Sequence, residues 1–221
     1  MKTFLRYLVR TCWALISMLM TLLIVMVIAY FYLQKDLPDV STLKDVHLQV
    51  PMRIYSADHQ LMAEYGYKRR IPVQLKDVPP TLVHAVLATE DARYYSHPGV
   101  DVIGLVRAAK AVFLSGRKVQ GASTITMQVA RNFFLTRKKT YGRKLHEILL
   151  AIKIDHELSK DTVLELYLNK VYLGNRAYGV GAAAQIYYGK PLKALTVAQM
   201  AMIAGLPQAP SRNNPIRNPS Q

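Results

Sequence analysis

A long uncharged segment near the N-terminus constrains this chain most. No charged residue stands between Arg10 and Lys35, and the 24 residues from Thr11 to Gln34 are mostly apolar. A helix of about 20 apolar residues is long enough to cross the hydrocarbon core of a bilayer. A cleaved signal peptide, the alternative, has a shorter apolar region followed by small residues, which this sequence lacks. The segment therefore predicts an uncleaved, single transmembrane helix over residues 11–34.

The charges that flank this segment predict its orientation. Lys2, Arg6 and Arg10 precede the apolar run, and positively charged flanks stay in the cytoplasm. We therefore expect a cytoplasmic leader over residues 1–10, a polar connector over 35–50, and an exported domain over 51–221. The chain ends in Pro-Ile-Arg-Asn-Pro-Ser-Gln with no closing helix, which indicates a C-terminally truncated domain.

The charge balance indicates an anionic partner. The chain has 29 Lys and Arg against 14 Asp and Glu, a formal net charge of +15. Nucleic acid, an anionic membrane surface and a phosphorylated substrate all fit such a balance. Export leaves the membrane and the phosphorylated substrate and argues against nucleic acid. The single cysteine, Cys12, excludes a disulfide within the exported part.

The exported part is predicted to be mainly α. A strand-like pattern over residues 51–75 with a turn at 56–59 predicts a small N-terminal β-hairpin. Helical periodicity follows from Pro79-Pro80 onward. The apolar or capping residues that define the expected helices are Leu82, Val83, Val86 and Leu87; Val102, Leu105, Val106 and Ala109; Ser123 or Thr124 with Ile125, Val129 and Phe133; Leu145, Ile148, Leu149 and Ile152; Ser159 with Val163, Leu164, Tyr167 and Leu168; and Thr196 with Gln199, before a stop at Gly205 and Pro207.

Two carboxylates stand where a helix is expected to end. Glu90 and Asp91 follow the apolar residues of the first helix. The aromatic pair Tyr94-Tyr95 comes next, and then His97 and Gly99. A solvated charge cluster at a helix C-terminus is the simple interpretation. Acidic residues there oppose the helix macrodipole, and an unfavourable placement of this kind indicates a functional reason.

Two further segments have features of an anion site. Residues 121–132 open a helix with small and hydroxylated side chains, so its free N–H groups could hold an anion, although an ordinary N-cap explains the same pattern. Residues 137–147 contain five cations within eight residues and then Glu147. A surface salt bridge from Arg143 to Glu147 is the simple interpretation, and a phosphate site competes with it on an exported domain.

Taken in order, these segments resemble the peptidoglycan glycosyltransferase domain of glycosyltransferase family 51, found in class A penicillin-binding proteins and in monofunctional cell-wall polymerases. The resemblance covers roughly residues 52–219. The four family motifs are met as follows: EDxxFxxHxG by Glu90, Asp91, His97 and Gly99, with Tyr94 for Phe; GxSTxTQQ by Gly121, Ser123, Thr124, Thr126 and Gln128, with Met127 for the first Gln; RKxxE by Arg143, Lys144 and Glu147; and KxxxLxxYLN by Lys160, Leu164, Tyr167, Leu168 and Asn169.

The resemblance implies a lysozyme-like main lobe and a reaction on lipid II. The 4-hydroxyl of one lipid II molecule attacks the anomeric carbon of the growing chain, undecaprenyl pyrophosphate leaves, and a β-1,4 bond forms with inversion. By resemblance, Glu90 is the base and Glu147 the second catalytic carboxylate, acting through a divalent metal, Mg or Mn, or by orienting a cation. The residues expected to bind substrate are Asp91, His97, Ser123, Thr124, Gln128, Arg131, Asn132, Lys138, Arg143 and Lys144.

The expected partners are lipid II, the growing lipid-linked glycan, membrane lipids and other cell-wall synthesis proteins, at the outer (periplasmic) face of the bacterial inner membrane. Two alternatives remain at this point. A membrane-anchored lysozyme-like hydrolase is disfavoured by the basic run, because a neutral glycan needs no pyrophosphate clamp. A non-catalytic lipid II-binding scaffold predicts loss of a catalytic carboxylate, yet both glutamates are present. The approach through residues 51–55 favours a class A penicillin-binding protein over a monofunctional enzyme.

Overall fold

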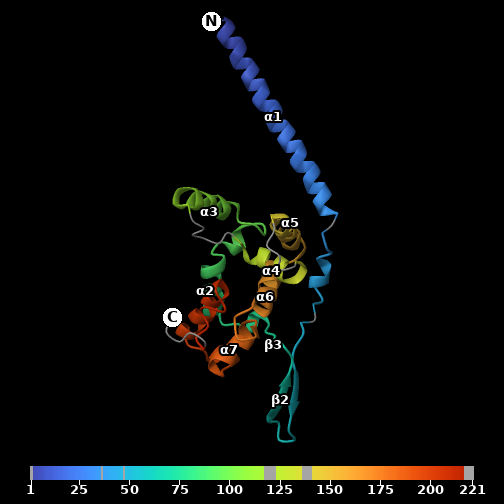
Figure 1. Cartoon of the computed structure of the whole chain (residues 1–221). Coiled ribbons are helices and arrows are strands. Elements are labelled where there is room, and N and C mark those ends of the chain that lie inside the picture. The colour runs from blue at the N-terminus through green and yellow to red at the C-terminus, as the bar shows by residue number, and fades with distance from the viewer. Residues whose placement is uncertain (1, 36, 47, 117–122, 136–140, 217–221) are drawn as a thin grey trace. The chain divides into compact units, whose positions relative to one another are not determined.

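A computed structural model describes residues 2–35, 37–46, 48–116, 123–135 and 141–216 (Figure 1). The chain divides into two units, Met1–Asp39 and Val40–Gln221. The first unit holds α1, Lys2–Gln34, a helix of 33 residues. The second unit holds all the other elements.

The predicted membrane segment, residues 11–34, lies within α1, which begins at Lys2 and so includes the predicted leader. The side chains of residues 2–5, 7–8, 26 and 29–34 lie outside the described part of this helix. Among the described residues, no helix is both long enough and apolar enough to span a membrane. The division into leader, transmembrane helix and connector stays a prediction.

The second unit is mainly helical, as expected from the sequence. Its α-helices are α2 (Pro80–Glu90), α3 (Val102–Ser115), α4 (Ile125–Phe134), α5 (Tyr141–Glu157), α6 (Lys160–Lys170), α7 (Val180–Tyr188) and α8 (Val197–Gly205). Short 3-10 turns lie at Ser41–Leu43, Leu75–Asp77, Tyr94–Ser96, Leu192–Ala194 and Leu206–Gln208. The predicted caps are present: Thr124 and Ser159 accept backbone N–H bonds of α4 and α6, and Thr196 with Gln199 forms a capping box on α8.

Two small sheets accompany the helices. The predicted hairpin is confirmed: β1 (Met52–Tyr55) pairs antiparallel with β2 (Leu61–Tyr65). The second sheet was not predicted. Its strands, β3 (Arg69–Arg70) and β4 (Ala177–Tyr178), are two residues each and pair in parallel, so they bring together segments that lie far apart in the sequence.

The core forms where α4 packs against α5 and α6, and where α2 packs against α8. The predicted buried residues of α6 are confirmed, because Val163, Leu164, Tyr167 and Leu168 are at most 1% exposed. Gly99 joins this core to the loop after α2. Its φ is +74°, and a Cβ there would lie 2.4 Å from the carbonyl oxygen of Ala151, so this close approach requires glycine.

Two helices are present as predicted but bury other residues than expected. In α5 the buried side chains are Glu147, Leu150, Ala151 and Ile154, whereas the expected Leu145 and Ile152 are exposed. The apolar pattern predicted the wrong buried face of α5 because the carboxylate of Glu147 occupies part of the true one.

In α3, the expected apolar face is covered only in part: Leu105 is partly buried and packs against the cluster of Val100, Met127 and Ala151. Val102 and Val106 are each 64% exposed, and Ile103, Phe113 and Leu114 are exposed beside them. The helix and the inward position of Leu105 were therefore predicted correctly, whereas the burial expected for Val102 and Val106 was wrong.

Candidate active site

A cavity of about 740 Å³ opens at the C-terminal end of α2. It lies between that end, the first turns of α3 and α4, and the 3-10 turn after α8. The residues that line it are Ala88, Thr89, Glu90, Asp91, Ala92, Arg93, Asp101, Gly104, Arg107, Ser123, Thr124, Gln128, Arg131, Pro207 and Gln208. The first two predicted motifs thus meet in one cavity although the sequence separates them by about 30 residues.

Glu90 ends α2 and forms part of the cavity wall. Its Oε2 accepts a hydrogen bond of 2.7 Å from Nε2 of Gln128, and its Oε1 is buried without a hydrogen-bond partner among the described residues. Burial raises the pKa of the Glu90 carboxyl, and nearby Asp91 adds to this, while the Gln128 hydrogen bond and the charge of Arg131 lower it. A carboxylate with a raised pKa beside an open cavity is suited to accept a proton.

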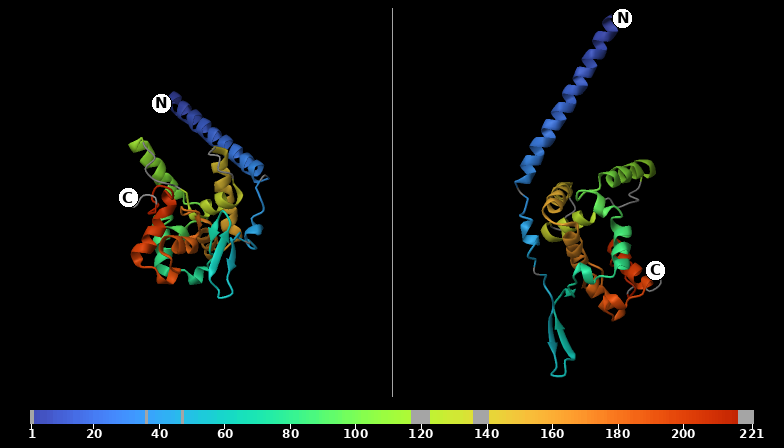
Figure 2. Two further views of the ribbon diagram at one scale, coloured as in Figure 1. Left: turned by 60° about the horizontal axis from the view of Figure 1, so that its bottom comes forward. Right: turned by 180° about the vertical axis from the view of Figure 1, so that it is seen from behind.

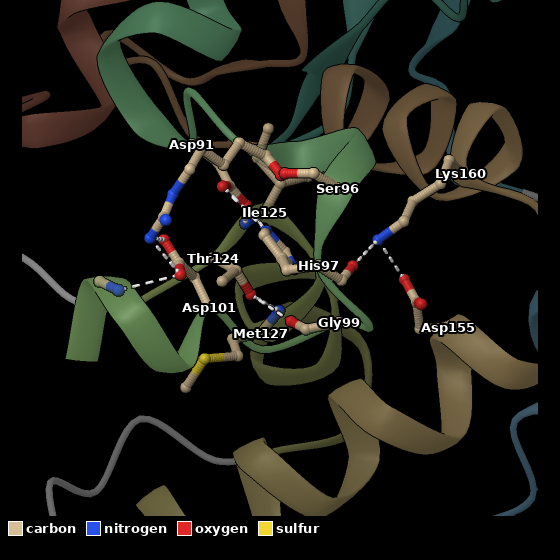
Figure 3. A network of polar contacts seen from close by, with 12 residues as sticks. Asp91, Ser96, His97, Gly99, Asp101, Thr124, Ile125, Met127, Asp155 and Lys160 are labelled. Atoms are coloured by element: carbon tan, nitrogen blue, oxygen red, sulfur yellow. Dashed lines mark hydrogen bonds and ion pairs between the residues drawn. The ribbon is translucent and has the colours of Figure 1, made fainter. Parts of the chain in front are cut away.

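Asp91 is less suited to accept a proton, because both of its carboxylate oxygens already take part in hydrogen bonds. Figure 3 shows its carboxylate against the His97 ring, with Nε2 at 2.9 and 3.0 Å from the two oxygens, and the Ile125 N–H donates to Oδ2 at 3.0 Å. Both side chains are buried. The pair therefore fixes the end of α2 to the start of α4. Asp91 lines the cavity, whereas His97 is not among the lining residues.

Ser123 and Thr124, the hydroxyl residues before α4, are also held by hydrogen bonds within the protein. Thr124 donates to the carbonyl of Gly99 at 2.6 Å and accepts from the N–H of Met127, and it is 3% exposed. Ser123 accepts a 2.8 Å hydrogen bond from Nζ of Lys144. Thr124 therefore positions the loop, while Ser123 connects the cavity to the basic end of α5.

Glu147 lies at the centre of a second cluster, on α5. It is completely buried, and it accepts from Nη1 of Arg143 at 2.7 Å and from Nζ of Lys144 at 2.9 Å. The Arg143–Glu147 pair is therefore not the surface salt bridge that its spacing first indicates. The chain of contacts from Glu147 through Lys144 to Ser123 brings this cluster to the border of the Glu90 cavity.

The remaining predicted substrate-binding residues are only partly brought together. Arg131 lines the cavity and its Nη2 lies 3.5 Å from Oε1 of Gln128. Asn132 is exposed and does not line the cavity. Lys138 lies outside the described residues.

Sequence reasoning missed three charged residues of the cavity wall. Arg93 donates from Nη2 to both oxygens of Asp101, at 2.5 and 2.7 Å, and Asp101 also caps α3 through the N–H of Gly104. Arg107 lies one turn further along α3. The N-cap pattern of an Asp before an apolar helix could have identified Asp101, but no local signal marks the arginines as cavity residues.

Comparison with known proteins gives the family. The model of a family described as Transglycosylase matches residues 58–221. The chain belongs to this family. Penicillin-binding protein 1A of Escherichia coli is 60% identical over 187 residues, which cover 85% of this chain and 22% of that protein. The protein of the same name from Pseudomonas aeruginosa is 51% identical over 209 residues, 95% of this chain and 25% of that protein. The chain thus spans about a quarter of the length of these relatives.

Among solved structures, the crystal structure of penicillin-binding protein 1A from Haemophilus influenzae is 37% identical, with a TM-score of 0.41 over 77% of this chain and 16% of that one. The predicted membership in the peptidoglycan glycosyltransferase family is confirmed by the family match and the curated relatives.

The two departures from the transglycosylase motifs both lie in the core. Tyr94 is 1% exposed, and its hydroxyl, which the usual Phe lacks, donates to the carbonyl of Lys160 at 2.7 Å. Met127 is completely buried in a cluster with Val100 and Ala151. Neither departure removes a group from the cavity wall.

The predicted divalent metal finds little support in the protein's own side chains. Among the described residues, no group of three His, Cys, Asp or Glu side chains could hold a metal ion. The residue expected nearest to it, Glu147, has a cation on each oxygen. The described side chains therefore do not form a metal site by themselves.

Proposed function

We propose that this chain is the peptidoglycan glycosyltransferase part of a class A penicillin-binding protein. It polymerises lipid II into β-1,4-linked glycan with release of undecaprenyl pyrophosphate. The observation that carries the proposal is the placement of Glu90. Its partly buried carboxylate, with a raised pKa, stands at the wall of an open cavity bordered by the Glu147 cluster.

The reaction requires a base and a stabilised leaving group. Glu90 takes the proton of the attacking 4-hydroxyl as its oxygen bonds to the anomeric carbon. The bond from that carbon to the pyrophosphate oxygen breaks at the same time, and the electron pair leaves with the pyrophosphate. The pKa of Glu90, raised by burial, makes the ionised carboxylate a stronger base than an exposed glutamate.

The cations at the border of the cavity serve the leaving group. The Lys144 side chain is 36% exposed and that of Arg143 17% exposed, so Lys144 is the more accessible to a pyrophosphate. Developing negative charge is best stabilised by donors that are already in place. The two contacts of Glu147 hold these cations in place before substrate arrives, which favours a role in orienting cations over one in binding a metal.

The same proposal includes the location of the protein, its partners other than lipid II, and the divalent metal. We place the protein at the outer face of the bacterial inner membrane, with the N-terminus in the cytoplasm, on the basis of the uncharged run over residues 11–34 and its basic leader. Membrane lipids and cell-wall synthesis proteins are its expected partners. Fractionation and protease accessibility of each terminus test the topology, and titration of activity with a chelator and then Mg²⁺ or Mn²⁺ tests the metal.

The test of function is polymerisation of fluorescent lipid II by the protein, beside Glu90→Gln and the matched control Glu157→Gln on α5. Wild type and control should give long glycan, and Glu90→Gln none, with lipid II binding retained. Because the neutral form of Glu90 is favoured in the folded state, Glu90→Gln should melt at or above the wild-type temperature, so inactivity cannot reflect unfolding. Shortening of preformed glycan would instead identify a hydrolase, and binding without turnover a scaffold.

A further inference from the structure

Lys160, the first residue of α6, stands at a position that is unfavourable for a cation. The N-terminal end of a helix carries partial positive charge, so a carboxylate stabilises it and a lysine does not. Ser159 already caps this helix by accepting the N–H of Thr162, and Asp161 supplies the favourable charge in its first turn. The placement of Lys160 therefore indicates a role outside its own helix.

The side chain of Lys160 makes three contacts outside α6. Nζ donates to the carbonyl oxygen of His97 at 2.6 Å and lies 2.6 Å from Oδ1 of Asp155, as Figure 3 shows. Nζ also lies 4.8 Å from the ring centroid of Tyr94. The Lys160 side chain is only 21% exposed. A charged donor makes a stronger hydrogen bond than a neutral one, so the bond to His97 holds that carbonyl firmly.

The residue that Lys160 holds is linked to Glu90 by further hydrogen bonds. The His97 ring lies against both oxygens of Asp91, the residue that directly follows Glu90. Oδ2 of Asp91 accepts the N–H of Ile125 at the start of α4. One turn into that helix, Gln128 donates to Oε2 of Glu90. The contacts that start at the His97 carbonyl therefore end at the Glu90 carboxylate.

The fold places Lys160 on the other side of the unit from α2. Figures 1 and 2 show α2 with α8 on one side and α5 with α6 on the other, and each of these pairs is in contact. The loop over residues 91–101 follows α2, and at Gly99 it comes so close to the backbone of α5 that no side chain would fit. The hydrogen bond from Lys160 to His97 therefore connects the loop that carries the first motif to the α5–α6 side.

Lys160 is placed to act through this loop and not on the substrate. It is not one of the described residues that line the Glu90 cavity. The pKa of Glu90 is shifted by burial, Gln128, Arg131 and Asp91, so its protonation responds to groups other than Lys160. A purely structural ion pair between α5 and α6 is the simple alternative.

We propose that Lys160 is a positioning residue for glycosyl transfer: through the carbonyl of His97 it holds the loop that keeps Glu90 in place at the cavity wall. This inference rests on the proposed polymerase function, because that function makes Glu90 the base. A misplacement of about 1 Å at a catalytic group can lower the rate about 100-fold, so loss of this hydrogen bond should lower kcat. KM should change little, because no residue of the cavity wall is removed.

The test compares three variants with wild type. Lys160→Met keeps the length of the side chain and removes its donor, and Lys160→Arg restores a donor. The matched control, Asp155→Asn, removes the charge from the ion pair but leaves Lys160 able to donate to His97. For each protein, kcat and KM for lipid II polymerisation are measured as a function of pH, well below its melting temperature.

We expect Lys160→Met to lower kcat about 10- to 100-fold with an unchanged KM, and to leave the acid limb of the pH profile in place. Lys160→Arg should regain most of the lost kcat, and Asp155→Asn should keep the wild-type kcat even if it melts at a lower temperature. A wild-type kcat in Lys160→Met, a loss that appears only in KM, or an equal loss in Asp155→Asn would overturn the inference.

Amide hydrogen exchange separates this inference from the polymerase function. The N–H of Ile125 donates to Asp91, so it should exchange faster in Lys160→Met than in wild type or Asp155→Asn. If wild type makes no polymer, the proposed function fails, and the exchange rates still decide whether Lys160 holds the loop beside Glu90. Equal exchange in all three proteins would overturn the inference whatever their activity.

Discussion

The hydrogen bond from Gln128 to Glu90 should set the pH at which the enzyme loses activity. Replacing Gln128 by Met keeps the length and approximate volume of the side chain and removes its donor. Gln128 is 8% exposed and its Nε2 lies 2.7 Å from Oε2 of Glu90, so the lost interaction is a short bond to a charged group.

The size of the effect follows from the structure. A hydrogen bond to a charged group contributes about 1.5–3 kcal/mol, and 1.36 kcal/mol corresponds to one pKa unit. Because Glu90 faces an open cavity, we take the lower end of that range, and the loss of the bond raises the pKa of Glu90. Arg131 still lowers the pKa, and burial and Asp91 still raise it. The base works when ionised, so activity falls as pH drops through this pKa. The acid limb should move to higher pH, and on that limb the variant should be about tenfold less active than wild type.

The assay is kcat/KM for lipid II polymerisation as a function of pH, for wild type, Gln128→Met and the control Gln185→Met on an exposed position of α7. The variant should regain most of its activity above the shifted limb. A uniform loss at every pH, with the limb unmoved, would refute the reasoning and assign Gln128 to substrate binding instead.

Two other predictions concern buried groups. Glu147→Gln should lower the free energy of unfolding by about 2–4 kcal/mol, because it leaves two cations beside a completely buried amide. Chemical denaturation measures this free energy. A change below about 1 kcal/mol would contradict the prediction. Tyr94→Phe should destabilise by about 1 kcal/mol, whereas Tyr167→Phe should be neutral or stabilising. Of these two hydroxyls, that of Tyr94 has a hydrogen-bond partner among the described residues and that of Tyr167 has none. Equal melting temperatures for the two variants would disprove that difference.

The sequence predicts where the helices of this fold lie better than it predicts which of their residues are buried. Caps and periodicity locate the helices, because these signals are local. The buried face of α5 was misplaced since Glu147 occupies it, and the exposed face of α3 could not be foreseen from an apolar pattern that usually indicates burial.

The candidate site was also predicted only in part from the sequence. Motif resemblance grouped Glu90, Gln128 and Ser123, which line one cavity in the structure. It could not distinguish residues of the cavity wall from those that hold the wall in place, such as His97. The pairing of β3 with β4 was beyond prediction because two-residue strands leave almost no pattern in a sequence.

The two glutamates differ in their surroundings, and this difference separates their roles. Glu90 has one amide partner, a buried free oxygen among the described contacts, and an open cavity beside it. Glu147 has no exposed surface and a cation on each oxygen. A proton from an incoming sugar can reach the first carboxylate but would have to displace a cation to reach the second. Paired carboxylates in sugar chemistry commonly take different roles through such differences in environment. We therefore expect Glu90 to exchange a proton in each catalytic cycle and Glu147 to keep Arg143 and Lys144 aligned throughout it.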